Sequence, residues 1–134
     1  QALRLVGPDF AQPLALIAWS QVVEQVRDAG LPVMVFAGNR GGIQIHSGPI
    51  QRIVRTPGWW NVLDVGFDWH VREAAVASVW LVRKPTRDGV VTSVEVYDLQ
   101  GESLFWLFGV RKPGQTESAA WRALAEALLA GANA

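Results

Sequence analysis

The residues of this sequence best suited to chemistry are a run of aromatic side chains followed by a cation. Phe105, Trp106, Leu107 and Phe108 are consecutive, and Arg111 follows them closely. Because side chains alternate across a strand, both faces of a strand here would carry aromatic rings. One face can fill the core, while the other needs a second layer, a partner or a flat apolar ligand to cover it.

Two further cations, Arg83 and Lys84, come at the end of another predicted strand. If hairpins connect the strands in sequence, these cations and Arg111 lie near the aromatic run. Aromatic rings with cations at their rim suit a flat hydrophobic ring system that carries carboxylates. Arg and Lys at strand ends are also commonly just solvated, so spacing alone leaves both interpretations open.

Other polar groups give weaker signals. Asp68, His70 and Arg72 alternate with apolar residues, and a solvated strand face is favoured over a catalytic one. His46 is more typical of a hydrogen-bonded structural residue than of a metal ligand. The sequence has no nucleophile elbow, P-loop, dinucleotide fingerprint or metalloprotease motif, so we predict no catalytic residue.

These residues would be positioned by hairpin-linked strands between two helices. The first helix is predicted to open at Gln12-Pro13 and to end at Gly30, with apolar residues at three- and four-residue spacing. Thr116 is the predicted N-cap of the last helix, which would end at Gly131. The predicted strands cover 33–37, 43–46, 67–72, 75–84, 90–98 and 103–111, and 59–64 has no safe assignment. This order predicts an α+β fold, a large antiparallel sheet flanked by helices, in one domain over 1–134.

Composition excludes several classes of protein. With 12 Lys+Arg against 12 Asp+Glu in 134 residues, broad electrostatic binding of nucleic acid is not expected. No apolar run reaches the roughly 18 residues that a membrane helix needs. The absence of Cys excludes disulfides, thiolate zinc sites and iron–sulfur clusters. Seven Trp suit either a large core or a surface for a flat ligand.

Four stretches carry a likeness to a known family. They are GNRGGIQIHSGP at 38–49, WNVLD at 60–64, VRKPT at 82–86 with Asp88-Gly89, and FGVRKPG at 108–114. Over nearly the whole chain, in order and spacing, the sequence resembles the cytoplasmic hemin-degrading/haem-transport factor family of bacterial haem-uptake systems. Members of that family consist of two similar halves, and this chain resembles the C-terminal half.

The resemblance implies one repeat of a two-repeat haem-utilisation fold, with haem held between the sheet and neighbouring helices. Carried onto this sequence, Lys84 and Arg111 match cations that bind the haem propionates. Phe36, Phe105 and Phe108 match residues of the pocket wall. The family often has Tyr and Gln where this chain has Phe105, Trp106 and Phe108, which implies fewer polar contacts to the propionates here.

The resemblance also implies ligands that this chain does not contain. The family's axial His belongs to a helix just upstream of the stretch matching 1–6, and a distal Arg comes from the N-terminal half. The helical-looking start, without Met or cap, leads us to expect a fragment entered partway through that helix. Neither His46 nor His70 matches the axial position, so no metal ligand is assigned. The fragment alone is expected to bind haem poorly, or only through its pocket, unless a second chain supplies ligands.

The function implied by the resemblance is cytoplasmic haem binding and trafficking, from a haem importer towards a haem oxygenase. One alternative is reductant-dependent haem degradation, and a transport role is favoured over this enzymatic one. Another is a structural half-domain without haem binding of its own, which dimerises or covers a partner domain with its aromatic face. The expected partners are haem, an oxygenase or importer, and a second copy of the chain, with no membrane or nucleic acid.

Overall fold

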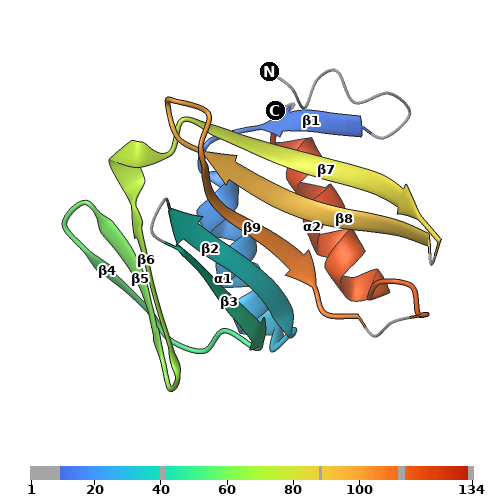
Figure 1. The fold of residues 1–134 in the computed structure, drawn as a ribbon, viewed down its shortest axis with the longest axis horizontal. Coiled ribbons are helices and arrows are strands. Elements are labelled where there is room, and N and C mark those ends of the chain that lie inside the picture. The colour runs from blue at the N-terminus through green and yellow to red at the C-terminus, as the bar shows by residue number, and fades with distance from the viewer. Residues whose placement is uncertain (1–9, 40–41, 88, 112–113, 133–134) are drawn as a thin grey trace.

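The fold combines a large antiparallel sheet, a small one and two helices (Figure 1). The structure, a computed structural model, describes residues 10–39, 42–87, 89–111 and 114–132. Neighbouring strands of the six-stranded sheet are, in order, β1 (Phe10–Leu14), β7 (Ser78–Thr86), β8 (Gly89–Tyr97), β9 (Ser103–Gly109), β2 (Val33–Asn39) and β3 (Gly42–Gly48). All five pairings are antiparallel, which confirms the predicted α+β class.

The small sheet lies beside the β2–β3 hairpin (Figure 1). It contains β4 (Ile53–Thr56), β5 (Trp59–Asp64) and β6 (Phe67–Arg72), and a single 3₁₀ turn over Glu73–Ala75 leads from it to β7. The segment 59–64, which the sequence pattern could not assign, is therefore the central strand of this sheet. Trp60 and Val62 are fully buried on the face of β5 that packs on the core.

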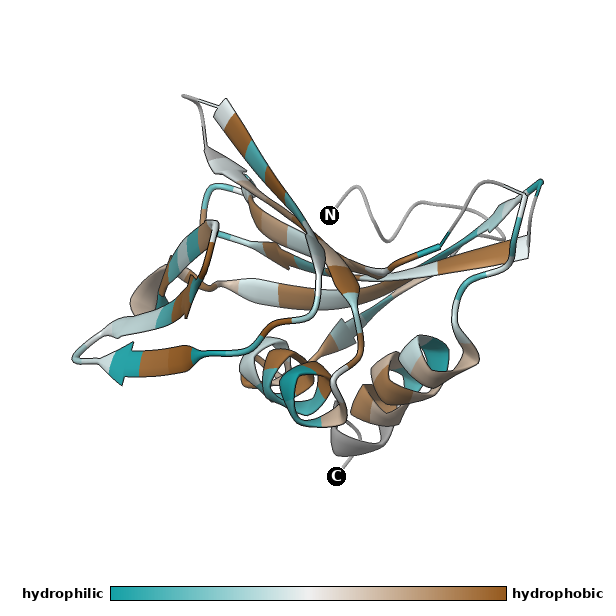
Figure 2. Cartoon of the chain, turned by 90° about the horizontal axis from the view of Figure 1, so that it is seen from below, coloured by the Kyte–Doolittle hydropathy of each residue, from teal (hydrophilic) through white to brown (hydrophobic). Residues whose placement is uncertain are grey.

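Both helices lie against the same face of the large sheet, below it in Figure 2. Helix α1 (Ala18–Ala29) buries Ala18, Val22 and Val26 of the predicted apolar stripe, whereas Ile17 before it and Ala29 at its end are exposed. Gly30 ends the helix with a left-handed φ of 64°. The predicted start at Gln12-Pro13 is wrong, because these residues belong to β1. Pro13 is tolerated there because β1 is an edge strand, where one side of the backbone needs no partner.

Helix α2 (Ala119–Ala132) begins after the predicted cap and ends one residue beyond the predicted end. Ser118 rather than Thr116 supplies the capping oxygen, since the Trp121 backbone N–H donates to Ser118 Oγ over 3.3 Å. None of the helices in the described part of the chain has the length and apolar character needed to cross a membrane.

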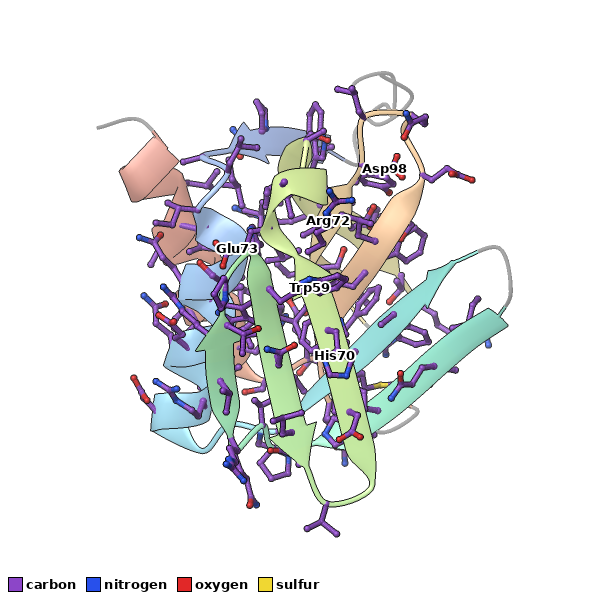
Figure 3. All side chains as sticks on the ribbon, turned by 90° about the vertical axis from the view of Figure 1, so that its left-hand side faces the viewer. Trp59, His70, Arg72, Glu73 and Asp98 are labelled. Carbon is purple, nitrogen blue, oxygen red and sulfur yellow. The ribbon has the colours of Figure 1, made fainter. Side chains whose placement is uncertain are left out.

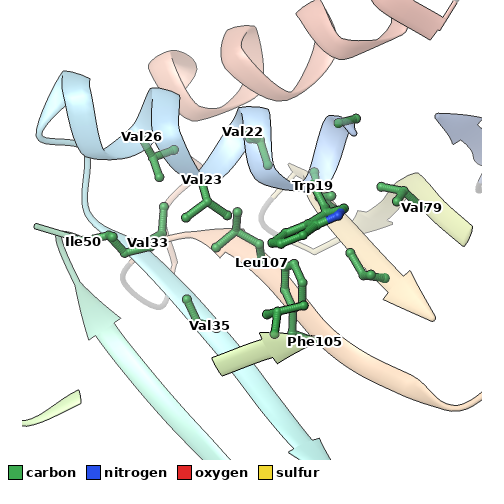
Figure 4. Close-up of a cluster of buried hydrophobic side chains, with 14 of the residues drawn as sticks. Trp19, Val22, Val23, Val26, Val33, Val35, Ile50, Val79, Phe105 and Leu107 are labelled. Atoms are coloured by element: carbon green, nitrogen blue, oxygen red, sulfur yellow. The ribbon is translucent and has the colours of Figure 1, made fainter. Parts of the chain in front are cut away.

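The core lies between the helices and the lower face of the large sheet (Figure 4). Val22, Val23 and Val26 of α1 are fully buried against strand residues such as Val33 and Leu107. Because strand side chains alternate, filling this layer with every second residue leaves the others on the opposite face. We call that opposite face, which points upward in Figure 2, the upper face.

Candidate ligand-binding face

The upper face carries a row of large side chains that crosses five strands. The register places Trp80 of β7, Glu95 of β8, Trp106 of β9, Phe36 of β2 and Ile45 of β3 side by side. A second row, one pleat along, consists of Val82, Ser93, Phe108, Met34 and Ser47. Neighbours in such rows are close enough for their side chains to contact each other.

The aromatic residues of these rows form a cluster. The ring centroids of Phe36 and Phe108 are 5.5 Å apart in a T-shaped arrangement, and those of Trp106 and Phe108 are 6.5 Å apart. An open groove of about 710 Å³ borders the cluster, lined by Phe36, Gly38, Ile43, Leu104, Trp106 and the polar residues Asp98, Glu102 and Ser103. The groove is thus mainly apolar and has a size that suits an organic ligand.

Of the three predicted pocket-wall residues, two lie together and one does not. Phe36 and Phe108 share the upper face, whereas Phe105 points to the helices and is fully buried. Phe105 makes T-shaped contacts with Trp19 and Trp69, at centroid distances of 6.0 and 4.7 Å. Its assignment to the pocket wall is therefore wrong, because the alternation of β9 places it in the core.

The two predicted propionate-binding cations lie at one end of the sheet. Lys84 pairs in register with Val91 of β8, is exposed and falls on the upper face by alternation. Arg111 follows the end of β9, which is the next strand after β8. Two strand spacings of about 4.8 Å therefore separate the strands that carry these cations. Arg111 Nη1 also donates to the Gln115 carbonyl over 3.4 Å.

Arg83 lies on the lower face of the large sheet, which the helices cover, and not on the upper face with Lys84. It pairs in register with Thr92, and its Nη2 lies 2.8 Å from Glu126 Oε2 of α2. The neighbouring cations Arg83 and Lys84 thus point to opposite faces of β7, as alternation requires.

A buried carboxylate on the upper face was not predicted. Glu95 is 2% exposed between Trp80 and Trp106 of the flanking strands. Its Oε1 accepts a hydrogen bond from the Tyr97 hydroxyl over 2.6 Å, and its Oε2 accepts one from Ser93 Oγ over 3.0 Å. Polar residues at 93, 95 and 97 alternate with Val94 and Val96. This period of two is the pattern in the sequence from which a polar group on one face of the strand could have been predicted.

Comparison with known proteins places the chain in a family. Residues 1–128 match the model of the haemin-degrading HemS/ChuX domain. The chain belongs to this family. The hemin transport protein HemS of Yersinia enterocolitica is 37% identical over 122 residues, which are 91% of this chain and 35% of HemS.

Two solved structures of similar proteins share the fold closely. Holo-PhuS, a heme-binding protein from Pseudomonas aeruginosa, superposes with a TM-score of 0.89 at 45% identity, over 95% of this chain and 37% of PhuS. ChuS, an E. coli heme oxygenase, gives a TM-score of 0.89 at 38% identity, over 96% of this chain and 39% of ChuS. The chain therefore spans little more than a third of the length of these relatives.

Neither histidine of this HemS/ChuX domain lies on the upper face. His46 points to the other side of β3, where its ring stacks on Phe67 at 4.2 Å and its Nε2 contacts the Pro49 carbonyl at 3.3 Å. His70 belongs to the small sheet. These contacts engage the His46 ring, and its structural role remains a prediction. Within the described residues, no three His, Cys, Asp or Glu side chains are grouped as a metal site.

We expect Tyr97, the only tyrosine of the chain, to stay neutral in strongly alkaline solution. Burial raises the pKa of Tyr97 well above its ordinary value of 10.0, and the hydrogen bond to Glu95 and its charge raise it further. Because the pKa of Tyr97 is higher in the folded than in the unfolded chain, its neutral hydroxyl contributes stability that is fully present below about pH 10. This contribution is lost as the pH rises through the folded-state pKa.

An alkaline titration followed by tyrosinate absorbance measures this pKa directly. Tyrosinate should form only well above the ordinary pKa, or together with unfolding. A midpoint close to that of free tyrosine in the folded protein would contradict the expectation.

Proposed function

We propose that this HemS/ChuX domain binds haem on its upper face. The observation that carries the proposal is the cluster of Phe36, Trp106 and Phe108, with Lys84 and Arg111 at one end of the same sheet. Haem is a flat apolar macrocycle with two propionates on one edge. Aromatic rings suit its plane, and cations at one end suit its carboxylates.

The chain is proposed to supply the wall and the cations of the site but no iron ligand on this face. Both of its histidines lie elsewhere, so an axial His would come from a segment upstream of Gln1 or from another chain. We propose that it is a C-terminal haem-binding repeat; the chain spans 35% of the length of HemS. Bound haem would supply the redox chemistry of its iron, and the chain would orient it and exclude water.

The role that we favour is cytoplasmic carriage of haem, from an importer towards a haem oxygenase. The similarity to a hemin transport protein supports carriage, while the similarity to ChuS, a heme oxygenase, favours reductant-dependent degradation as the alternative. Adding ascorbate to the haem complex in air separates the two. A stable Soret band supports carriage, and a progressive loss of the band supports degradation.

A structural role for the upper face is the second alternative. Ile43 and Ile45 on the edge strand β3 are 73% and 59% exposed, an apolar surface that a second copy or another domain could cover. Sedimentation with and without hemin distinguishes the roles. A tight dimer that takes up no hemin would favour the structural role over haem binding.

Replacing both cations, by Lys84→Ala with Arg111→Ala, is expected to weaken haem binding by about 1–3 kcal/mol. The propionates would lose two charged hydrogen-bond donors. Hemin titrations followed at the Soret band measure the change. Arg55→Ala is the matched control, because Arg55 is exposed and pairs with Glu24 of α1 on another part of the surface. Equal affinities of the double variant and the control would remove both cations from the site.

A further inference from the structure

A second groove lies between the small sheet and the β2–β3 hairpin. Its volume is about 730 Å³, and Trp59, His70 and Arg72 of the small sheet face Ile43 and Leu104 of the large one across it. Figure 3 shows Trp59, His70 and Arg72 one after another along β5 and β6. The groove shares Gly38, Ile43 and Leu104 with the groove of the upper face, so the two are neighbours.

Noncovalent contacts between the two sheets hold the walls of this groove in place. Gln44 Nε2 of β3 donates to the Asp68 carbonyl of β6 over 3.0 Å. The ring of His46, two residues further along β3, stacks on Phe67, the neighbour of Asp68 in β6, with an interplanar angle of 11°. The position of β6 against the hairpin is thus fixed by contacts that do not involve His70.

The hydrogen bonds of Asn61 determine which nitrogen of the neutral His70 ring carries the proton. Asn61 is 8% exposed, and its Nδ2 donates to the Val54 carbonyl over 2.9 Å. Because that carbonyl can only accept, the amide orientation is fixed and Oδ1 is the atom that faces His70 Nδ1, at 2.7 Å. Nδ1 must then carry the proton, which leaves the lone pair of the neutral ring on Nε2. A buried acceptor behind Nδ1–H is the arrangement that orients histidines towards a metal.

The ligand chemistry that fits this groove is a metalloporphyrin rather than a bare ion. One imidazole without a group of further donors cannot hold a free cation, and none of the described residues form such a group. A porphyrin brings four of the iron ligands itself and needs only an axial nitrogen from the protein. Trp59, 44% exposed, offers a flat apolar wall, and Arg72 pairs with it in register and offers a cation.

We propose that this groove is a second haem-binding position in which His70 Nε2 is the axial ligand of the iron. The inference rests on the proposed function, in that haem must be the molecule that the chain handles. Because the two grooves share Gly38, Ile43 and Leu104, this second position would lie next to the proposed site on the upper face.

The test is a hemin titration read by the iron–histidine stretching band in resonance Raman spectra of the reduced complex. The wild-type chain should show this band, because His70 offers an open nitrogen. His70→Gln should remove the band, reduce the haem taken up at saturation by one equivalent and weaken this position by more than about 10-fold. His46→Gln is the matched control and should keep the band, since His46 is engaged by Phe67 and Pro49.

Three outcomes would overturn the second position: no histidine band in the wild type, a band that survives His70→Gln, or a band that His46→Gln removes. Thermal unfolding of each variant shows that it is folded, which His70→Gln should be because His70 is exposed. The double variant of Lys84 and Arg111 separates the two proposals. This variant should bind haem more weakly on the upper face and keep the iron–histidine band. If the wild type and this variant show the band but bind haem equally well, the second position stands and only the proposed function is overturned.

Discussion

Replacing Phe105 with alanine is expected to lower the free energy of unfolding by about 3–5 kcal/mol. Phe105 is fully buried and packs edge-on against Trp19 of α1 and Trp69 of β6, so its ring joins three elements of the fold. Truncation would leave a cavity that large aromatic neighbours cannot close. Haem affinity of the folded fraction should change little, because the ring faces away from the upper face.

Phe108→Ala is the matched variant and should have the opposite effects. Phe108 is half-buried on the upper face, where it contacts Phe36 and Trp106. Its loss should cost the fold less than Phe105→Ala does, and should weaken haem binding by about 1.5–3 kcal/mol through lost apolar contact. Urea unfolding measures the stability of both variants, and hemin titration measures their haem affinity. A larger loss of haem affinity in Phe105→Ala than in Phe108→Ala would contradict the assignment of the two faces.

The sequence could predict that the run 105–108 covers two faces, but not which face is the core. Both faces carry aromatic residues, so the hydrophobic pattern does not distinguish them. The decision depends on Gly109, which shares the face of Phe105. A Cβ on Gly109 would lie 2.7 Å from the Trp121 ring, so α2 packs closely on this face of β9. That contact joins residues of separate elements and leaves no local signal.

Elements set by local signals were predicted well, and those set by distant pairing were not. The strands from β7 to β9 follow from their turn residues and alternation. The start of α1 was misplaced because Pro13 also suits the first turn of a helix, and only its pairing with Trp80 makes it an edge strand. The hydrogen bond between Asn61 and His70 likewise depends on the register of β5 and β6, which the ambiguous Trp59-Trp60 pair does not reveal.

Trp121→Ala is expected to be as destabilising as Phe105→Ala, at about 3–5 kcal/mol. The side chain is fully buried against Gly109, and its Nε1–H donates to the Thr92 carbonyl over 2.9 Å. Thr92 is also held by Glu117, whose carboxylate accepts from the Thr92 backbone N–H over 2.7 Å and from its hydroxyl over 2.6 Å. Glu117, just before α2, and Trp121 in the first turn of α2 are thus joined to Thr92 in the middle of β8 by three hydrogen bonds.

Trp121→Phe separates the two contributions of the indole. The phenyl ring fills most of the space but cannot donate to the Thr92 carbonyl, so this variant should lose about 1–3 kcal/mol, the cost of a buried acceptor without a partner. Chemical denaturation of both variants gives the comparison. Equal destabilisation would mean that the hydrogen bond, not the packing, dominates. Because Thr92 adjoins Ser93, which holds Glu95 on the upper face, Trp121→Ala should also loosen the strand that lies between Lys84 and the aromatic cluster.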